Sequence, residues 1–276
     1  MELYHSNMSV CAQKVRLVLR EKNLKPIEHL VNLRAGDQMR PEYLKLNPNG
    51  VVPTLVDRGV PIIESTVICE YLEDTYPEPS LRPKGTVQRA AMRLWTMRPD
   101  TGVHHACGVI TFAIAFRYQM LAMSKEALER HLAQRRHTKM WESLVQTIEL
   151  GIKAPQVGPA LKAYDQALDL MGRQLNQTPW LAGDEYTLAD VAMLPYVCRL
   201  EDLNMSWMWD GERAAIGAWL TRCKARPNFS GMADYLDANS LKLMSDSGRD
   251  LRPNLESILK TEQLPVPTAA GAVCSV

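Results

Sequence analysis

Two side chains near the N-terminus are the first candidates for chemistry. Ser9 and Cys11 lie in "HSNMSVCAQKVRLVL", between a short apolar segment ending at Tyr4 and an amphipathic segment starting near Gln13. The start of a helix offers free N–H groups and the positive end of the helix dipole, and both stabilise a thiolate. Ser9 could equally be a helix N-cap, and Cys11 a small apolar filler. The spacing alone does not choose between these roles.

Two further pairs of residues point to a binding site. Pro53 lies inside the apolar run "VVPTLV" and cannot donate to a strand ladder, so this run is an edge strand or starts at a cis peptide bond after Val52. Glu64 and Ser65 open the helical pattern of "ESTVICEYLED". Ser65 is predicted to be the N-cap and Glu64, which follows two isoleucines, to be buried. A helix N-terminus at Ser65 would attract an anion.

The remaining cysteine and histidine residues indicate no metal site. The six cysteines form no CxxC pair and no Cys/His spacing typical of zinc, so we expect reduced, intracellular thiols. His104 and His105 are adjacent on a predicted long helix without a carboxylate at metal-binding spacing. Such a pair is more typical of a helix surface, and no metal is predicted.

The composition fits a globular protein that acts on a small molecule or a protein. The chain has 276 residues, 46% of them hydrophobic, which suffices for one large unit or two modest domains. A net charge of +1 gives no reason to expect nucleic acid or an anionic membrane as a partner. The start "MELYH" has no signal-peptide pattern, and no window approaches 18 uninterrupted apolar residues. We expect a soluble cytoplasmic protein.

The N-terminal part alternates strands and helices. Its first three elements predict a βαβ unit, whose two strands are most often parallel. A hairpin follows, because two apolar runs flank the turn residues 57–59, and then a helix that ends before Pro77. The predicted elements are a strand at 2–5, a helix at 12–23, a strand at 27–33, a short helix within 40–50, strands at 51–56 and 60–63, and a helix starting at Ser65.

The C-terminal part is predicted to be all helical. "PEPSLRPKGT" (77–86) carries three prolines and a glycine, which indicates an interdomain linker. Helical periodicity then covers 87–123, 125–150, 156–176, 187–203 and 212–225. The polar, proline-spaced tail indicates an extended or disordered arm. The predicted domains are 1–78, a linker at 79–86, a helical domain at 87–244 and a tail at 245–276.

These patterns together resemble the glutathione transferase superfamily. "NPNGVVPTL" (47–55) resembles the loop ahead of that family's cis-proline, and "IIESTVICEYLED" (62–74) resembles its glutamate-serine motif. "WLAGDEYTLADVAMLP" (180–195) is similar to its stretch with a capping box and hydrophobic staple, formed here by Thr187, Asp190 and Tyr186. The resemblance covers about residues 1 to 235. It implies a thioredoxin-like α/β domain followed by a helical bundle domain, glutathione as cosubstrate, no metal, and a homodimer.

Two subclasses are suggested by different segments. "ESTVICEYLED" with "AAMRLWTMRPD", and a long insertion from about 117 to 155, resemble bacterial β-aryl etherases that cleave lignin-derived ethers. "MSVCAQKVRLVL" instead resembles zeta-type isomerases and reductive dehalogenases, where a Ser-x-Cys element precedes the first helix. The alternatives to an etherase-like transferase are therefore a Cys-dependent thiol transferase, isomerase or dehalogenase, and a non-catalytic ligand or protein binding module.

The resemblance also implies roles for individual residues. The backbone of Val52, beside Pro53, would pair with the cysteinyl part of glutathione. Ser65 would hold the γ-glutamyl carboxylate, and Glu64 the amine. Ser9 would donate to the glutathione sulfur, or Cys11 would form a mixed disulfide. Asn7 and Gln38 are further predicted contacts, and Gln38, Arg40 and Lys45 are the candidates for the glycyl carboxylate.

The second substrate is expected on the first long helix of the helical domain. Fourteen methionines and the runs "MLAM" and "MSWMWD" are consistent with an adaptable apolar wall for aromatic ligands. Ordinary core packing explains any single one of these residues equally well. The predicted wall consists of Trp95, His104, Phe112 and Phe116.

Overall fold

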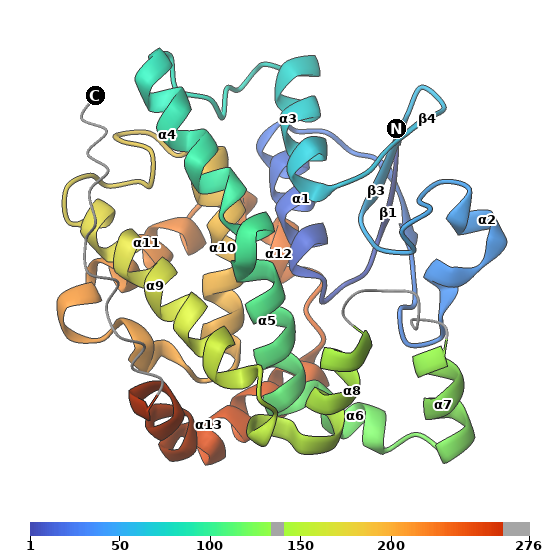
Figure 1. Ribbon diagram of the computed structural model, residues 1–276. Coiled ribbons are helices and arrows are strands. Elements are labelled where there is room, and N and C mark those ends of the chain that lie inside the picture. Colours follow the sequence, from blue (N-terminus) through green and yellow to red (C-terminus); the bar gives the residue numbers. More distant parts are fainter. Residues whose placement is uncertain (134–140, 262–276) are drawn as a thin grey trace, which may run out of the picture.

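The N-terminal domain is built on a four-stranded mixed sheet (Figure 1). The structure is a computed structural model and describes residues 1–133 and 141–261. The strand order is β2-β1-β3-β4, with β1 parallel to β2 and β3 antiparallel to both β1 and β4. The predicted parallel βαβ unit is confirmed. The strands are β1 (Glu2–His5), β2 (Ile27–Leu30), β3 (Thr54–Asp57) and β4 (Val60–Ile62).

The cis peptide bond predicted at Pro53 is present between Val52 and Pro53. The alternative, an edge strand, is wrong because β3 lies between β1 and β4. Pro53 directly precedes β3, so its missing N–H removes no hydrogen bond from the ladder.

Helices α1 and α3 lie between the sheet and the helical domain (Figure 1). The three helices of this domain are α1 (Val10–Glu21), α2 (Pro41–Leu44) and α3 (Ser65–Thr75). Apolar residues of α1 such as Val15, Val18 and Leu19 are buried in a core shared by both domains. The prediction that Ser65 is the N-cap of α3 is wrong: Glu64 occupies the cap position with φ 67°, and Ser65 is the first helical residue.

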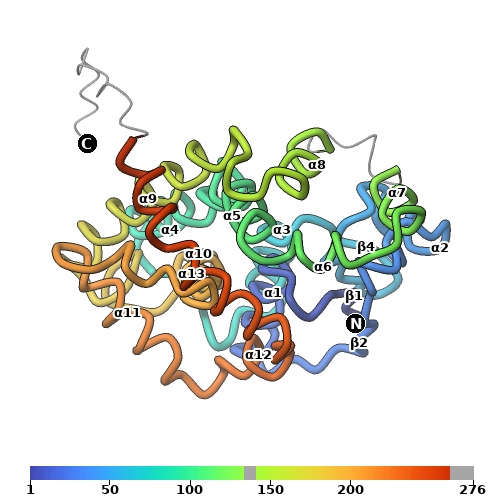
Figure 2. Tube along the Cα trace, turned by 90° about the horizontal axis from the view of Figure 1, so that it is seen from below, coloured from blue at the N-terminus to red at the C-terminus, as the bar shows by residue number. Residues whose placement is uncertain are grey.

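The described residues of the second domain form helices joined by loops, as predicted. Helix α10 runs through its middle and contacts α1 of the first domain (Figures 1 and 2). Its helices are α4 (Thr86–Met97), α5 (His104–Thr111), α6 (Arg117–Leu121), α7 (Lys125–Ala133), α8 (Trp141–Leu150), α9 (Val157–Leu175), α10 (Leu188–Asp202), α11 (Ala215–Lys224), α12 (Ser230–Ala233) and α13 (Ala238–Thr261). Among the described residues, no helix is long and apolar enough to cross a membrane.

The predicted continuous helix over 87–123 is interrupted twice. A π-helical turn, η2 (Pro99–Val103), separates α4 from α5 and contains Gly102 at φ 152°. A second π-helical segment, η3 (Phe112–Phe116), separates α5 from α6. Proline at the start of η2 and the glycine inside it explain the first break, because neither favours a helix interior. The kink directly precedes His104.

The prediction of an extended or disordered tail from residue 245 is wrong for residues 245–261, which belong to α13. Buried Met244 and Leu255 anchor this helix, and Gly248 lets it approach the carbonyl of Leu203 closely. Pro253 does not end the helix. The remainder of the predicted tail, 262–276, lies outside the described residues.

A capping box positions α10, as predicted. The Thr187 hydroxyl accepts from a backbone N–H of the first turn, and the Asp190 carboxylate accepts from the Thr187 N–H at 3.0 Å. Asp190 is fully buried and also accepts from the Leu181 N–H at 3.0 Å and the Trp219 indole at 2.8 Å. Burial raises the pKa of Asp190 to about 6, although these hydrogen bonds oppose the rise. This cluster is structural.

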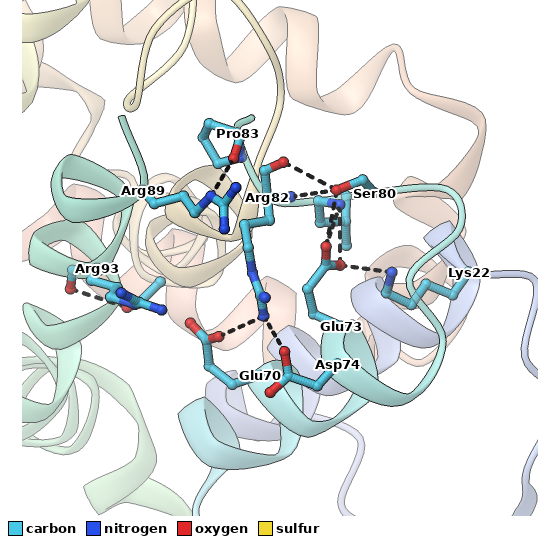
Figure 3. A network of polar contacts seen from close by, with 11 residues as sticks. Lys22, Glu70, Glu73, Asp74, Ser80, Arg82, Pro83, Arg89 and Arg93 are labelled. Carbon is cyan, nitrogen blue, oxygen red and sulfur yellow. Dashed lines mark hydrogen bonds and ion pairs between the residues drawn. The ribbon is translucent and has the colours of Figure 1, made fainter. Parts of the chain in front are cut away.

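The interdomain linker is held by a buried ion pair (Figure 3). Lys22, the C-cap residue of α1, and Glu73 of α3 lie 2.7 Å apart, with side chains 0% and 3% exposed. Glu73 also accepts from the Leu81 N–H at 3.1 Å and the Ser80 hydroxyl at 3.0 Å, while Lys22 donates to the Pro79 carbonyl at 3.0 Å. Because every polar group of the pair has a partner, the linker is fixed to both helices.

Candidate functional site

Three elements from two domains meet at Cys11. Cys11 lies in the first turn of α1, His104 begins α5, and Tyr196 belongs to α10. The Cys11 Sγ is 3.5 Å from the His104 Nδ1 and 3.8 Å from the Tyr196 hydroxyl oxygen, and these last two atoms are 3.3 Å apart. Cys11 is partly buried, Tyr196 is buried, and His104 is exposed. The thiol is therefore reachable and paired with an imidazole.

The surroundings of Cys11 favour its thiolate. Burial opposes ionisation, but the hydrogen bond and charge of His104, the charge of Lys14 and a hydrogen bond from Ser65 outweigh it and lower the pKa of Cys11 to about 7. The hydrogen bond with Cys11 in turn raises the pKa of His104, against the effect of burial. Ser65 thus lies beside Cys11, so the structure brings together two predicted site residues that are far apart in sequence.

Cys11 differs in this respect from the other cysteines among the described residues. Burial raises the pKa of Cys69 to about 12 and raises that of Cys107 as well. Burial also raises the pKa of Cys198 and Cys223. Each of these four thiols has a Lys or Arg side chain nearby, but burial outweighs the cation and keeps the thiol protonated, which makes it unreactive. Cys11 is thus the reactive thiol of this group.

Ser9 is the N-cap of α1. Its side-chain oxygen accepts from the Ala12 N–H at 3.2 Å. A serine hydroxyl that accepts one hydrogen bond can still donate its own proton. Ser9 thus caps the helix, which is the structural alternative. That it donates a hydrogen bond to the glutathione sulfur stays a prediction.

Two buried arginines fix the loop before α1. Arg16 donates to the Asn7 carbonyl at 3.0 Å, and Arg199 of α10 donates to the Met8 carbonyl at 2.7 Å. The side-chain oxygen of Asn7 is buried and has no hydrogen-bond partner within the part of the chain that the structure describes. Asn7 therefore has an acceptor available to a ligand.

The loop before β3 presents free backbone groups. Tyr43 donates to the Val51 carbonyl at 2.6 Å, and Asn47 donates to the same carbonyl at 2.9 Å. These two side chains therefore fix the loop. No hydrogen bond to the N–H or C=O of Val52 is found across residues 1–133 and 141–261. Backbone groups left free beside a cis-proline are suited to pairing with an extended peptide.

The prediction that Glu64 is buried is wrong. Its side chain is exposed and accepts from the Asn49 amide at 3.3 Å, whereas Ser65 is buried at 6% exposure. The φ of 67° at Glu64 explains the difference, because it turns this residue away from the apolar strand that precedes it. A left-handed conformation is uncommon for glutamate and typical of strained functional positions.

The three candidates for the glycyl carboxylate differ in their surroundings. Gln38 is buried in the 3-10 turn η1 (Asp37–Met39), and its amide nitrogen donates to the Leu33 carbonyl at 3.4 Å. Its side-chain oxygen has no partner in the described segments. Arg40 is exposed and forms an ion pair with Asp37 at 2.7 Å, and Lys45 is exposed. All three stay predictions.

The predicted apolar wall divides into two groups. Phe112 and Phe116 are partly buried and pack edge to face in η3, with ring centres 5.8 Å apart. Trp95 is 7% exposed and belongs to the core, with the Arg98 guanidinium 4.8 Å from its ring centre. His104 lies at Cys11. Within the described residues, no group of three or more His, Cys, Asp or Glu side chains is placed to hold a metal ion.

Two residues at this site were not predicted. Tyr196 lies within the apolar stretch "VAMLPYVC" (191–198) of α10, so its sequence indicates only a core position. Lys14 is fully buried and donates to the Thr66 hydroxyl at 3.2 Å, although its place among charged residues of α1 indicates a surface position. No sequence pattern links either residue to Cys11.

Comparison with known proteins agrees with this architecture. Residues 3–80 match the family described as glutathione S-transferase, N-terminal domain, and residues 116–227 match glutathione S-transferase, C-terminal domain. The chain belongs to the glutathione S-transferase family. Its thioredoxin-like domain and its helical domain are the two domains of that family.

Individual relatives share about a quarter of their residues with this chain. Glutathione S-transferase TCHQD of Arabidopsis thaliana is 27% identical over 238 residues, which cover 83% of this chain and 88% of the relative. Protein LigF of Sphingobium sp. strain SYK-6 is 27% identical over 237 residues, which cover 84% and 92%. The crystal structure of the β-etherase LigF superposes with a TM-score of 0.76 at 27% identity and covers 85% of this chain and 99% of that one.

Proposed function

We propose that the protein binds glutathione between the loop before β3 and the start of α3, and that the glutathione thiolate attacks an apolar electrophile. The observation that carries this proposal is that Ser65, the first residue of α3, lies close enough to Cys11, in the first turn of α1, to help lower the pKa of its thiol. Two helix N-termini therefore face the same small region, and each favours negative charge. A ligand with a carboxylate and a thiolate fits such a region.

Each part of glutathione has a candidate partner. The Ser65 hydroxyl and the N-terminus of α3 would hold the γ-glutamyl carboxylate, with the exposed Glu64 carboxylate receiving the amine. The N–H and C=O of Val52 would pair with the cysteinyl residue like an added strand. The free side-chain oxygens of Asn7 and Gln38 would accept N–H groups of the tripeptide.

The reaction would be a nucleophilic displacement. The Ser9 hydroxyl would donate a hydrogen bond to the glutathione sulfur and thereby lower the pKa of that thiol. The same hydroxyl oxygen would continue to accept a hydrogen bond from the Ala12 N–H. Binding both reactants in one site replaces a bimolecular encounter by an oriented one. Phe112 and Phe116 would contribute to the apolar wall against which the electrophile packs.

We further propose an aryl ether next to a ketone as the electrophile. The similarity to a protein described as a β-etherase, over 99% of its chain, supports this choice. The ketone activates the neighbouring carbon that carries the aryloxy group. Attack by the thiolate would form a carbon–sulfur bond and release a phenolate, giving a glutathione thioether and a phenol.

A second candidate function depends on Cys11 itself. Its pairing with His104 at 3.5 Å favours a Cys-dependent thiol transferase, isomerase or reductive dehalogenase. The test that separates the two candidates is glutathione-dependent release of a fluorescent phenol from an α-keto β-aryl ether, measured with the native protein, Ser9→Ala and Cys11→Ala. The first candidate predicts release by the native protein and Cys11→Ala, and a strong loss in Ser9→Ala.

Two other outcomes of this test would support a different function. Loss of release in Cys11→Ala alone would support the Cys-dependent mechanism. No release by any of the proteins would refute ether cleavage and leave another transferase substrate, or a non-catalytic binding module, as the function.

The proposal includes a homodimer. Val67 of α3 and three side chains of α4, Val87, Leu94 and Met97, are large, apolar and more than half exposed. Such side chains on neighbouring helices are suited to burial against another chain. Light scattering after gel filtration should give twice the chain mass of 31.1 kDa. A monomer at micromolar concentration would refute this part of the proposal.

A further inference from the structure

Lys14 is buried without an anionic partner. It lies in the first half of α1 and is 1% exposed. Its ammonium group donates one hydrogen bond, to the Thr66 hydroxyl at 3.2 Å, and lies 5.9 Å from the centre of the Tyr196 ring. The lysine ion pairs found in residues 1–133 and 141–261 are formed by other lysines. Lysine is almost never fully buried unless it is paired, because an ammonium group is costly to remove from water.

Lys22 is the matched case of a buried lysine that has its anion. It follows the C-terminal end of the same helix and lies 2.7 Å from the Glu73 carboxylate. For Lys14, the carboxylate that lines the same small cavity is that of Glu70, which forms its ion pair with Arg82 at 3.3 Å. Within the described part of the chain, no direct contact with an anion therefore neutralises Lys14, and a ligand can supply the negative charge.

Two buried arginines add positive charge around the loop before Ser9. Arg16 and Arg199 are 2% and 4% exposed. Arg16 donates to the first two carbonyls of residues 6–8 at 3.3 Å and 3.0 Å, and Arg199 donates to the third at 2.7 Å. Arg199 also has the Asp202 carboxylate at 3.7 Å. Because three consecutive carbonyl oxygens are bound to guanidinium groups, their partial negative charges are compensated, and the start of α1 favours an anion.

We propose that Lys14 is the charge partner of the glutathione thiolate. The inference rests on the proposed function, because it needs glutathione bound between the starts of α1 and α3. Lys14 follows Cys11 by one turn of α1 and donates to Thr66 in the first turn of α3, so its ammonium group lies where these two helices begin. A cation acts on an anion more strongly in such a buried region than in water. Lys14 transfers no proton and acts through its charge alone.

The charge of Lys14 already acts on thiols around the site. Burial raises the pKa of Cys69 to about 12, and the charge of Lys14 opposes this rise. At Cys11 burial also opposes ionisation, but the hydrogen bond and charge of His104, together with the charge of Lys14, lower the pKa to about 7. The thiolate of bound glutathione gains from the same charge. The other titratable groups that face this region are Glu70 of α3, Asp100 of η2, Cys107 of α5 and Tyr196 of α10.

The first test measures the ionisation of the thiol of bound glutathione. The ultraviolet absorbance of the thiolate is followed against pH in a Cys11→Ala background, so that the reactive thiol of the protein does not contribute. The variants added to this parent are Lys14→Met, Lys14→Gln and, as a matched control, Lys25→Met, which removes an exposed positive charge just after the same helix. A neighbouring cation lowers the pKa of an acid by about 1 to 3 units, so both Lys14 variants should raise the midpoint by at least about one pH unit. Lys25→Met should leave it unchanged, and equal midpoints in the parent and the Lys14 variants would overturn the proposal.

Stability distinguishes this role from a structural one. Urea denaturation is measured without ligand at pH 6, below the pKa of Cys11, where this thiol is mostly protonated. Lys14→Met should unfold at the same or a higher urea concentration than the native protein, because the variant removes a buried charge that has no anion. Lys22→Met should unfold at a lower concentration, because Glu73 then stays buried without its cation. A loss in Lys14→Met as large as that in Lys22→Met would make Lys14 a structural residue and overturn the proposal.

Binding of S-methylglutathione identifies the ligand group that Lys14 serves, since this compound keeps both carboxylates but has no thiol proton. Titration calorimetry is run at pH 9 with the Cys11→Ala parent and its Lys14→Met variant. A rise of one unit in the pKa of the bound thiol should weaken glutathione binding by about ten-fold, whereas the affinity for S-methylglutathione should change much less. Equal losses for both ligands would assign Lys14 to a carboxylate and overturn the proposal. If the native protein bound neither ligand, the proposed function itself would be refuted.

Discussion

Breaking the buried ion pair between Lys22 and Glu73 should destabilise the protein strongly. Their charged atoms lie 2.7 Å apart, and both side chains are almost completely buried. Glu73→Gln would leave the Lys22 ammonium buried without its anion, which typically costs about 3 to 5 kcal/mol. The carboxylate also accepts from Ser80 and Leu81, so loss of its charge weakens the attachment of the linker to α3 (Figure 3).

The assay is urea denaturation of three variants: Glu73→Gln, Lys22→Met and the double variant. Unfolding is monitored by tryptophan fluorescence and far-ultraviolet circular dichroism. The double variant should cost at least about 2 kcal/mol less than the sum of the single changes, because no lone buried charge remains. The control is Asp246→Asn, which removes the exposed Lys242–Asp246 pair and should cost less than about 0.5 kcal/mol. Single variants that cost no more than this control would refute the reasoning.

Three further stability predictions follow from buried contacts. Thr187→Ala should lower the free energy of unfolding by about 0.5 to 2 kcal/mol in urea denaturation, since it removes the cap of α10; an unchanged midpoint would contradict this. Gly248→Ala places a Cβ 1.7 Å from the Leu203 carbonyl oxygen and should lower the free energy of unfolding by more than about 1 kcal/mol. In the control, Gly217→Ala, the new Cβ has its nearest neighbouring atom 3.7 Å away, and the free energy of unfolding should rise by up to about 1 kcal/mol. Burial and the neighbouring guanidinium lower the pKa of His5 from 6.5 to about 4, so the unfolded chain binds a proton that the folded chain rejects. Stability should then fall by about 2 to 3 kcal/mol as the pH falls from 6.5 to 4, and His5→Asn should flatten this part of the profile; identical profiles would show that His5 is not responsible.

Local patterns were sufficient to predict most of the elements. The strand at Glu2–His5 alternates buried and half-buried residues, and the first helix and the capping box at Thr187 and Asp190 each have a signal within a few residues. Because proline cannot donate within a strand, the sequence left two alternatives at Pro53, an edge strand or a cis peptide bond, and the structure has the cis peptide bond. Such features depend on backbone preferences that neighbouring residues determine.

The parts that were predicted wrongly depend on contacts between distant residues. The tail was expected to be extended because of its prolines, yet packing of Leu255 and the close approach at Gly248 stabilise α13 through Pro253. Glu64 was expected to be buried because it follows apolar residues, but its positive φ turns it outward. Tertiary packing and an unusual backbone conformation thus overrode the local pattern.

The composition of the candidate site shows most clearly how contacts between distant residues escape a reading of the sequence. Cys11 and His104 are 93 residues apart, and Cys11 and Tyr196 are 185 residues apart. The sequence left Ser9 and Cys11 as equal alternatives, since either fits the start of a helix. The contact that distinguishes Cys11 exists only after α5 and α10 pack against α1.

Glutathione affinity tests the central claim most directly. Isothermal titration calorimetry of glutathione would be run with the native protein, with Ser65→Ala, and with Ser257→Ala as a control on the exposed surface of α13. A hydrogen bond to a charged group contributes about 1.5 to 3 kcal/mol, so Ser65→Ala should weaken binding by about 10- to 150-fold. We expect saturable binding at one site per chain in the native protein and in Ser257→Ala. Absence of binding, or equal affinity in Ser65→Ala, would contradict the placement of glutathione at the start of α3.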